Sequence, residues 1–372
     1  MLPTVYLNIL LAIFTSFAFA NYVIPSIIKI AEIKNLYDSP DGRKSHTRAI
    51  PNLGGIAIFG AFIISYCLFG NFYLSKEIKY ILASLCFIFM LGAKDDIVEL
   101  TPYKKFIGQI IAAVVIVCLG DIRLTSFYGF LGITQLPYII SVLFSVITIV
   151  FIINAFNLID GVNWLAAGTT LVICTTFGIW FYIHGYIDYT IMSACIFGSL
   201  VAFLRYNFTP ARIFMGDSGS LSLGLLSSVM AIVFIEDSAK VVHSSADLPF
   251  HVISAPALAI AIMIIPIFDT LRVFTLRISK GQSPFQADRN HHHHRLLELG
   301  FTHIQTTLIL VTANIGFILL AYFLQELRTA ILIPIIFGAA IICSFALFSI
   351  KVPEKKAVKR VEAKSKLEVE NA

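Results

Sequence analysis

Long apolar stretches separated by short polar clusters constrain the fold of this chain more than any other feature of its sequence. A helix needs about 20 residues to cross a hydrocarbon core roughly 30 Å thick, and most of the apolar stretches approach that length. The stretches are continuous rather than alternating, which favours helices over the strands of a membrane β-barrel. The sequence therefore predicts an all-α, polytopic integral membrane protein with about eleven transmembrane helices. The predicted spans are 4–30, 53–70, 78–93, 106–120, 137–156, 163–184, 186–204, 219–236, 250–271, 304–324 and 329–350.

The composition agrees with this class, because 58% of the 372 residues are hydrophobic and only 13% are charged. Soluble domains carry about a quarter charged residues. Residues 4–30 follow no basic segment, so we expect a retained helix rather than a cleaved signal. We expect one membrane domain, residues 1–350, and a charged tail, residues 351–372, that is disordered or forms a short interfacial helix.

The basic residues predict the orientation of the chain. Eleven crossings place the two termini on opposite sides of the membrane. With the N-terminus outside, 22 of the 27 Lys and Arg residues fall on the inner side and five on the outer side. Inner loops of membrane proteins are enriched in Lys and Arg. The expected topology therefore has an outer N-terminus and a cytoplasmic C-terminus, and it places every polar cluster discussed below on the cytoplasmic side.

Two acidic clusters have the character of a metal and phosphate site. Asp95 and Asp96 end an apolar run, and adjacent carboxylates repel each other unless a cation lies between them. Mg²⁺ favours carboxylate and phosphate oxygens, and Lys105 follows one loop later. Asp217 lies in "MGDSGS", where glycines allow close approach and a helix start offers free N–H groups to an anion. The alternatives are a solvated helix end for the first cluster and a simple N-cap for the second.

A third cluster, "NAFNLIDG", places Asn154, Asn157 and Asp160 at three-residue spacing, on roughly one side of a helix. Carboxamides and a carboxylate at such a position can bind the edge of a uracil ring and a ribose. A contact between helices is the alternative role for these side chains. Asn207 and Arg212, in the next inner loop, are candidates for the same pocket.

Four consecutive histidines, residues 291–294, form the last cluster. Adjacent side chains on a helix point about 100° apart, so a helix cannot direct all four at one metal ion. His291 and His294 would share a face, with His293 beside them. Arg289 and Arg295 flank the run, so contacts to phosphate are favoured over a zinc site.

Taken together, the clusters from Asp38 to about Gly300 resemble, in order, those of the polyprenyl-phosphate N-acetylhexosamine-1-phosphate transferase superfamily. The family's Asp-Asp pair matches Asp95 and Asp96, and its metal-binding aspartate matches Asp217. The resemblance implies catalytic roles for these three residues and His291, with Asp217 and Asp95 holding the metal. Together with Asn207, the expected substrate-binding residues are Asp38, Lys44, His46, Lys105, Asn154, Asn157, Asp160, Phe214, His293 and His294.

The resemblance implies transfer of a HexNAc-1-phosphate, foremost GlcNAc-1-phosphate, from a UDP-sugar to undecaprenyl phosphate, with release of UMP. Mg²⁺ is the implied cofactor, with Mn²⁺ as an alternative. The implied setting is the bacterial cytoplasmic membrane, with the active site facing the cytoplasm and a membrane homodimer as an expected assembly. We expect no nucleic acid partner. The lipid-linked product would start the synthesis of a cell-surface glycan.

One motif departs from the family pattern. The family usually has "DGxDGLA", whereas this chain has "DGVNWLAA", with Asn163 and Trp164 in place of Asp and Gly. An inactive relative, supported by Trp164 alone, is therefore one alternative. A phospho-MurNAc-pentapeptide transferase is disfavoured because that branch has a different sequence after its histidines. A transporter is disfavoured because the charges lie at the ends of the spans rather than near the bilayer midplane.

Overall fold

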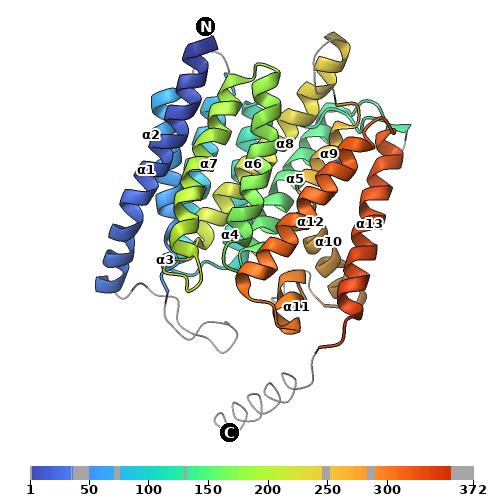
Figure 1. Ribbon diagram of the computed structural model, residues 1–372. Coiled ribbons are helices and arrows are strands. Elements are labelled where there is room, and N and C mark those ends of the chain that lie inside the picture. The colour runs from blue at the N-terminus through green and yellow to red at the C-terminus, as the bar shows by residue number, and fades with distance from the viewer. Residues whose placement is uncertain are drawn as a thin grey trace.

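The computed structural model describes residues 2–34, 36, 50–70, 76–129, 132–244, 252–282 and 290–352, and within these residues it contains helices and no strand (Figure 1). The all-α prediction is confirmed. The helices are α1 Leu2–Lys34, α2 Gly54–Phe69, α3 Ile78–Ile97, α4 Pro102–Val114 with the π-helical turn η1 Val115–Leu119, α5 Tyr138–Ile159, α6 Leu165–Ile183, α7 Ile187–Asn207, α8 Gly216–Ser244, α9 Ala255–Ile262, α10 Ile264–Ser279, α11 His292–Leu299, α12 His303–Phe323 and α13 Thr329–Ser349.

Each of the eleven predicted spans overlaps a helix, and the span 250–271 overlaps the pair α9 and α10. Among the described residues, eight helices are long and apolar enough to cross a membrane, and the bent pair raises this number to nine. The other two predicted spans correspond to α2, which is shorter, and α3, which ends in charged residues. The protein is a polytopic membrane protein, while the eleven crossings and their orientation stay predictions.

Helix α8 forms the centre of the bundle. Its apolar window is 94% buried, against 22% for α1 and for α13, which lie at opposite flanks (Figure 1). Glycines allow close packing around the start of α8. A Cβ on Gly92 of α3 would lie 2.6 Å from backbone atoms of Asp217 and Ser218, and Gly55 of α2 lies against Gly219. Small residues at helix contacts allow such close approach in membrane proteins. The "MGDSGS" segment is therefore held between α2 and α3.

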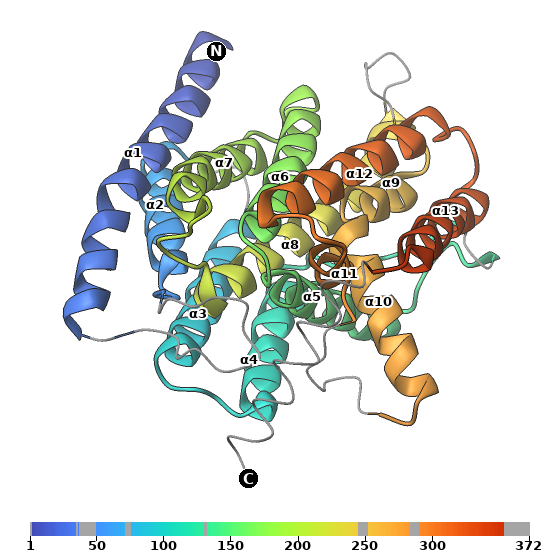
Figure 2. The ribbon, with the colours of Figure 1, turned by 60° about the horizontal axis from the view of Figure 1, so that its bottom comes forward.

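The predicted single span 250–271 is wrong in one respect, because the helix breaks at Met263 and α9 and α10 meet at an 81° bend. Pro266 has no N–H to donate to the carbonyl of Ile262, four residues earlier. The side chain of Asn314 in α12 donates to that carbonyl instead, at 3.0 Å. The bend directs α10 toward α11 at the lower end of the bundle (Figures 1 and 2).

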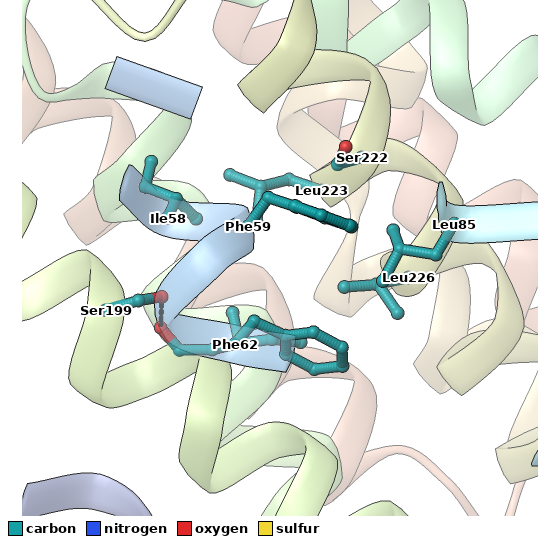
Figure 3. Close-up of a pocket in the computed structure, with 9 residues that line it drawn as sticks. Ile58, Phe59, Phe62, Leu85, Ser199, Ser222, Leu223 and Leu226 are labelled. Atoms are coloured by element: carbon teal, nitrogen blue, oxygen red, sulfur yellow. Dashed lines mark hydrogen bonds between the residues drawn. The ribbon is translucent and has the colours of Figure 1, made fainter. Parts of the chain in front are cut away.

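A small cavity lies between α2, α3, α7 and α8, and Figure 3 shows its mostly apolar lining. Its two hydroxyls are already bonded within their own helices: Ser199 donates to Ile196 at 2.8 Å and Ser222 to Ser218 at 2.6 Å. Such an apolar space lacks the polar partners that hold a water or a charged ligand. The chemistry must therefore lie elsewhere.

Candidate active site

Three charged side chains from three helices meet at one end of the bundle. Asp95 lies near the end of α3, Lys105 in the first part of α4, and Asp217 in the first turn of α8. The Lys105 ammonium lies 3.1 Å from Oδ2 of Asp95 and also pairs with Oδ2 of Asp217. These side chains are 14–24% exposed, so the cluster is accessible but shielded. The structure thus brings Asp95, Lys105 and Asp217 together, although they come from three different helices.

The turn between α3 and α4 explains the placement of Asp95. The backbone N–H of Leu100 donates to Oδ1 of Asp95 at 2.5 Å, and Pro102 begins α4 two residues later. Proline suits the first turn of a helix because its missing N–H would have no partner there. The short turn thus brings Lys105 back beside the end of α3.

Asp96 has a different task from its neighbour. Its Oδ1 accepts the backbone N–H of Asp217 at 2.6 Å, and its Oδ2 accepts that of Ser218 at 3.0 Å. The first N–H groups of a helix have no partner within the helix, so a carboxylate there caps it and suits its dipole. Gly216 has φ +73° and lies against Asp96, where a side chain would collide. Asp96 therefore positions Asp217, and Asp95 is the better candidate for the metal.

The three polar residues at the end of α5 have different partners. Asn157 donates to Oδ1 of Asp217 at 2.5 Å and to Ser220 at 3.0 Å. Asp160, which follows α5, lies near the acidic cluster: burial raises the pKa of its carboxyl well above the usual range, and Asp217 and Asp96 raise it further. Asn154 instead donates to buried Gln109 of α4, at 2.6 Å. The site thus contains Asn157 and Asp160, whereas Asn154 joins two helices, the alternative role that the sequence left open.

His291, the N-cap of α11, lies together with His293 and His294, and His292 lies apart from them. The rings of His291 and His293 are nearly parallel, with centroids 5.3 Å apart, and His294 lies 4.3 Å from His293 and 6.2 Å from His291. Nε2 of His293 would lie 2.9 Å from a Cβ on Gly161, so this group borders the turn that carries Asp160. Burial lowers the pKa of His293 to about 3, so its ring is neutral near pH 7. His292 packs on the other side, against Phe268 and Phe348.

Asp269 in α10 is a site residue that the sequence reasoning missed. Its side chain is nearly fully buried and accepts hydrogen bonds from His291 Nδ1 at 2.8 Å and from His292 Nδ1 at 2.5 Å. A single carboxylate inside the apolar stretch 255–271 was the available signal, because ionisable residues within membrane helices are rare and mostly functional.

Asn207 is the last residue of α7, and Phe214 lies on the loop that leads from α7 into α8. The Asn207 amide accepts the backbone N–H of Trp164 at 2.7 Å and donates to the carbonyl of Ile213 at 2.8 Å. The backbone of Phe214 donates to Pro51 at 2.8 Å and accepts from Gly54 at 2.9 Å. Asn207 therefore holds this loop through its side chain. Phe214, three residues before Asp217, is half-buried.

The two unusual residues of "DGVNWLAA" now have a structural explanation. Trp164 has φ +73°, the left-handed conformation that favours glycine, which accounts for the glycine usual at this position. Its indole donates to the carbonyl of Leu204 at 2.8 Å and meets the ring of Phe208 edge-on. The Asn163 amide donates to Thr209 at 3.3 Å. Both side chains thus pack against the end of α7, and Trp164 no longer argues for an inactive protein.

Asp38, Lys44, His46 and Arg289 lie outside the described residues. Within the described part of the chain, no three His, Cys, Asp or Glu side chains are grouped as a protein-only metal site. Mg²⁺, however, is usually held by one or two carboxylates together with substrate phosphates. The converging oxygens of Asp95 and Asp217 fit that donor set.

Comparison with known proteins shows which proteins this chain is similar to. The model of glycosyl transferase family 4 matches residues 78–235, which include Asp95, Lys105, Asn157 and Asp217. A probable undecaprenyl-phosphate N-acetylglucosaminyl 1-phosphate transferase of Bacillus subtilis is 31% identical over 324 residues, covering 86% of this chain and 85% of that protein.

Two further relatives are similar over most of their length. A decaprenyl-phosphate N-acetylglucosaminephosphotransferase of Mycobacterium tuberculosis is 32% identical over 289 residues, which is 73% of this chain and 71% of that protein. An undecaprenyl-phosphate alpha-N-acetylglucosaminyl 1-phosphate transferase of Salmonella typhi is 26% identical over 292 residues, which is 77% of this chain and 75% of that protein. With the acidic cluster inside the matched segment and this extent of similarity, the chain belongs to glycosyl transferase family 4.

Proposed function

We propose that this membrane protein transfers N-acetylglucosamine-1-phosphate from a UDP-sugar to undecaprenyl phosphate and releases UMP. The observation that carries the proposal is the convergence of Asp95, Lys105 and Asp217 from three different helices at one end of the bundle. The relatives are named as transferases for undecaprenyl or decaprenyl phosphate, which supports this choice of acceptor. The 22 basic residues expected on the inner side support a site that faces the cytoplasm of a bacterium.

The reaction needs a nucleophile, a leaving group and a means to bear negative charge. An oxygen of the lipid phosphate attacks the β-phosphorus of the UDP-sugar, and the bond from that phosphorus to the bridging oxygen breaks, with UMP as the leaving group. A phosphate monoester is mostly ionised at pH 7, because its second pKa is about 6. The acceptor therefore attacks without a strong base.

Each residue of the cluster has a defined task in this proposal. Asp217 and Asp95 would hold Mg²⁺, or Mn²⁺ as an alternative, which when bound neutralises charge on the pyrophosphate. Lys105, already paired with both carboxylates, binds a phosphate oxygen once the substrate enters. Asn157 and Asp96 fix the orientation of Asp217 through the contacts described above. His293, which lies against Gly161, and His291, whose ring is parallel to that of His293, bind the phosphates or the sugar.

Release of UMP from radiolabelled UDP-sugars by the purified protein tests this proposal. We expect UMP only when UDP-GlcNAc, undecaprenyl phosphate and Mg²⁺ are all present. Turnover of UDP-MurNAc-pentapeptide in place of UDP-GlcNAc would assign the protein to the other branch of the superfamily. Uptake of a UDP-sugar into vesicles without UMP release would indicate a transporter and overturn the proposal.

A further inference from the structure

The carboxylate of Asp269 accepts several hydrogen bonds although it lies within an apolar helix. The Asp269 side chain is 4% exposed, and its Oδ2 accepts a hydrogen bond from Nδ1 of His291 at 2.8 Å. Oδ1 accepts both the backbone N–H of His292 at 3.0 Å and its Nδ1 at 2.5 Å. The Arg272 guanidinium lies 3.7 Å from the same oxygen. One carboxylate therefore binds two consecutive residues of the histidine run through their side chains.

These contacts determine which ring nitrogens carry hydrogen. An ionised carboxylate only accepts hydrogen bonds, so Nδ1 of each histidine must be the donor. Nε2 of a neutral ring is then the acceptor, and the Ser344 hydroxyl of α13 lies 2.9 Å from Nε2 of His292, as this tautomer requires. For His291, the same tautomer leaves Nε2 free to accept a proton or a ligand on the side away from Asp269.

His291 and His292 contact different parts of the molecule. His291 lies parallel to His293, which borders Gly161, the residue that follows Asp160. His292 lies against Phe348 near the end of α13. The Arg295 guanidinium strengthens this second connection, since it donates to the carbonyls of Phe348 at 3.1 Å and Ile350 at 2.5 Å. Asp269 therefore connects the site to a brace between α11 and α13, which is formed by the contacts of His292 and Arg295 with residues 344–350.

We propose that Asp269 is a positioning residue: it holds His291 as the Nδ1–H tautomer with Nε2 directed at the substrate, and through His292 it fastens α11 to α13. The effect of Asp269 on catalysis rests on the proposed function, whereas the tautomer of His291 does not. Carboxylates that orient a functional histidine change activity by about 10–100-fold at metal sites and by about 10⁴-fold in the Ser-His-Asp triad.

The tautomer is tested by NMR of the full chain labelled with ¹⁵N-histidine in detergent micelles, with the His291 signal identified by its loss in His291→Gln. We expect Nδ1–H in the wild type and a shift toward Nε2–H in Asp269→Asn, because the amide can donate to Nδ1. A wild-type His291 in the Nε2–H form would overturn the proposal without any Asp269 variant. This measurement also stands if the protein proves to have another substrate.

The catalytic consequence is tested by a double-mutant cycle on UMP release. We expect Asp269→Asn to lower kcat at least tenfold, and to have little further effect in a His291→Gln background, because both changes remove one function. Asp188→Asn is the matched control, since it removes a buried carboxylate of α7 that lies at the other end of that helix from Asn207. We expect its kcat to change less than threefold.

Ser344→Ala separates the brace from the orientation of His291. It removes the partner of His292 Nε2 and leaves the bond between Asp269 and His291. We expect a lower Tm with kcat nearly unchanged. Additive effects of Asp269→Asn and His291→Gln would mean that Asp269 acts independently of His291, and the proposal would fall. A wild type inactive on every UDP-sugar would overturn the proposed function alone.

Discussion

Asp95 and Asp96 are adjacent in the sequence, yet they serve different parts of the site. Neighbouring side chains on a helix diverge by about 100°, so one carboxylate meets Lys105 and the other meets the start of α8. The pair therefore combines a charged contact at the reaction centre with a cap that holds Asp217. This division explains why two carboxylates can lie side by side without sharing a single ion.

Asp217→Asn should abolish most turnover. It removes one negative charge from the proposed metal site and leaves the size of the side chain unchanged. Loss of one preorganised electrostatic group lowers kcat by about 10²–10³-fold. The measurement is the rate of UMP release across a Mg²⁺ titration.

Asp121→Asn is the control for this variant, because Asp121 is 74% exposed and pairs with Arg123, away from the cluster. We expect it to retain wild-type activity. Near-normal turnover of Asp217→Asn at saturating Mg²⁺ would remove Asp217 from the metal site.

His293 should make the protein sensitive to acid. Burial lowers its pKa to about 3, whereas an unfolded histidine titrates near 6.5. Between these values the unfolded chain binds more protons than the folded one, so stability is fully present above pH 6.5 and falls as the pH drops toward 3. At pH 5 the free energy of unfolding is about 2 kcal/mol lower than at neutral pH.

The Tm in detergent between pH 4.5 and 7.5 measures this effect. His293→Gln, which cannot take up a proton, should show a flatter dependence over the same range. An equal acid-induced loss of Tm in both proteins would show that His293 is not the group responsible.

At the scale of helices and turns, two irregularities build the site. The break between α9 and α10 follows from Pro266 and is stabilised by Asn314, and it brings Asp269 to α11. The turn after α5 needs a left-handed residue at Trp164, whose N–H then binds Asn207 and secures the loop into α8. Irregular backbone at membrane depth is tolerated where protein groups satisfy its polar atoms.

Trp164→Gly tests whether the turn or the indole matters for the reaction. Glycine relieves a left-handed conformation that costs a non-glycine residue about 1–2 kcal/mol. The substitution also loses the indole bond to Leu204 and the contact with Phe208. We expect a Tm within a few degrees of the wild type and a kcat within threefold.

Trp164→Phe provides the comparison, because it keeps an aromatic ring and the strained backbone but removes the Nε1 donor. It should be less stable than the wild type and equally active. A loss of activity greater than tenfold in both variants would place the indole in contact with the substrate instead.

At the scale of the whole molecule, close helix packing around α8 sets the distance between the acidic residues. Gly92 and Gly55 let α3 and α2 reach the backbone at the start of α8. Protein interiors are packed too densely to absorb an extra methyl group at such a contact. The separation of Asp95 and Asp217 therefore depends on residues that take no part in the chemistry.

Gly92→Ala should lower activity by moving α3 away from α8. The new Cβ would lie 2.6 Å from the backbone of Asp217 and Ser218, so one helix must shift. Overpacking of this kind costs about 1–3 kcal/mol, which the Tm should register together with a higher KM for Mg²⁺.

Gly338→Ala in α13 is the matched control, since a Cβ there has no neighbour within 4 Å. It should leave activity and Tm unchanged. Wild-type metal dependence in Gly92→Ala would mean that the separation of Asp95 and Asp217 does not depend on this contact.

The sequence by itself determined the class of fold and the chemical character of the site. Apolar runs of membrane-spanning length predict helices because backbone polar groups in lipid must bond within their own segment. The three-residue spacing of His291 and His294 also indicated that these two rings lie on one side, and their centroids are 6.2 Å apart. Local rules suffice for such features.

Only the tertiary structure decided which polar residues work together. Asn157 rather than Asn154 reaches Asp217, and Asp95 rather than Asp96 faces Lys105, because the neighbouring helix determines which face of α5 or α3 borders the site. Asp269 joins the histidines only because Pro266 bends the helix that carries it. Contacts between different helices depend on how the helices pack, and no local pattern in the sequence records that geometry.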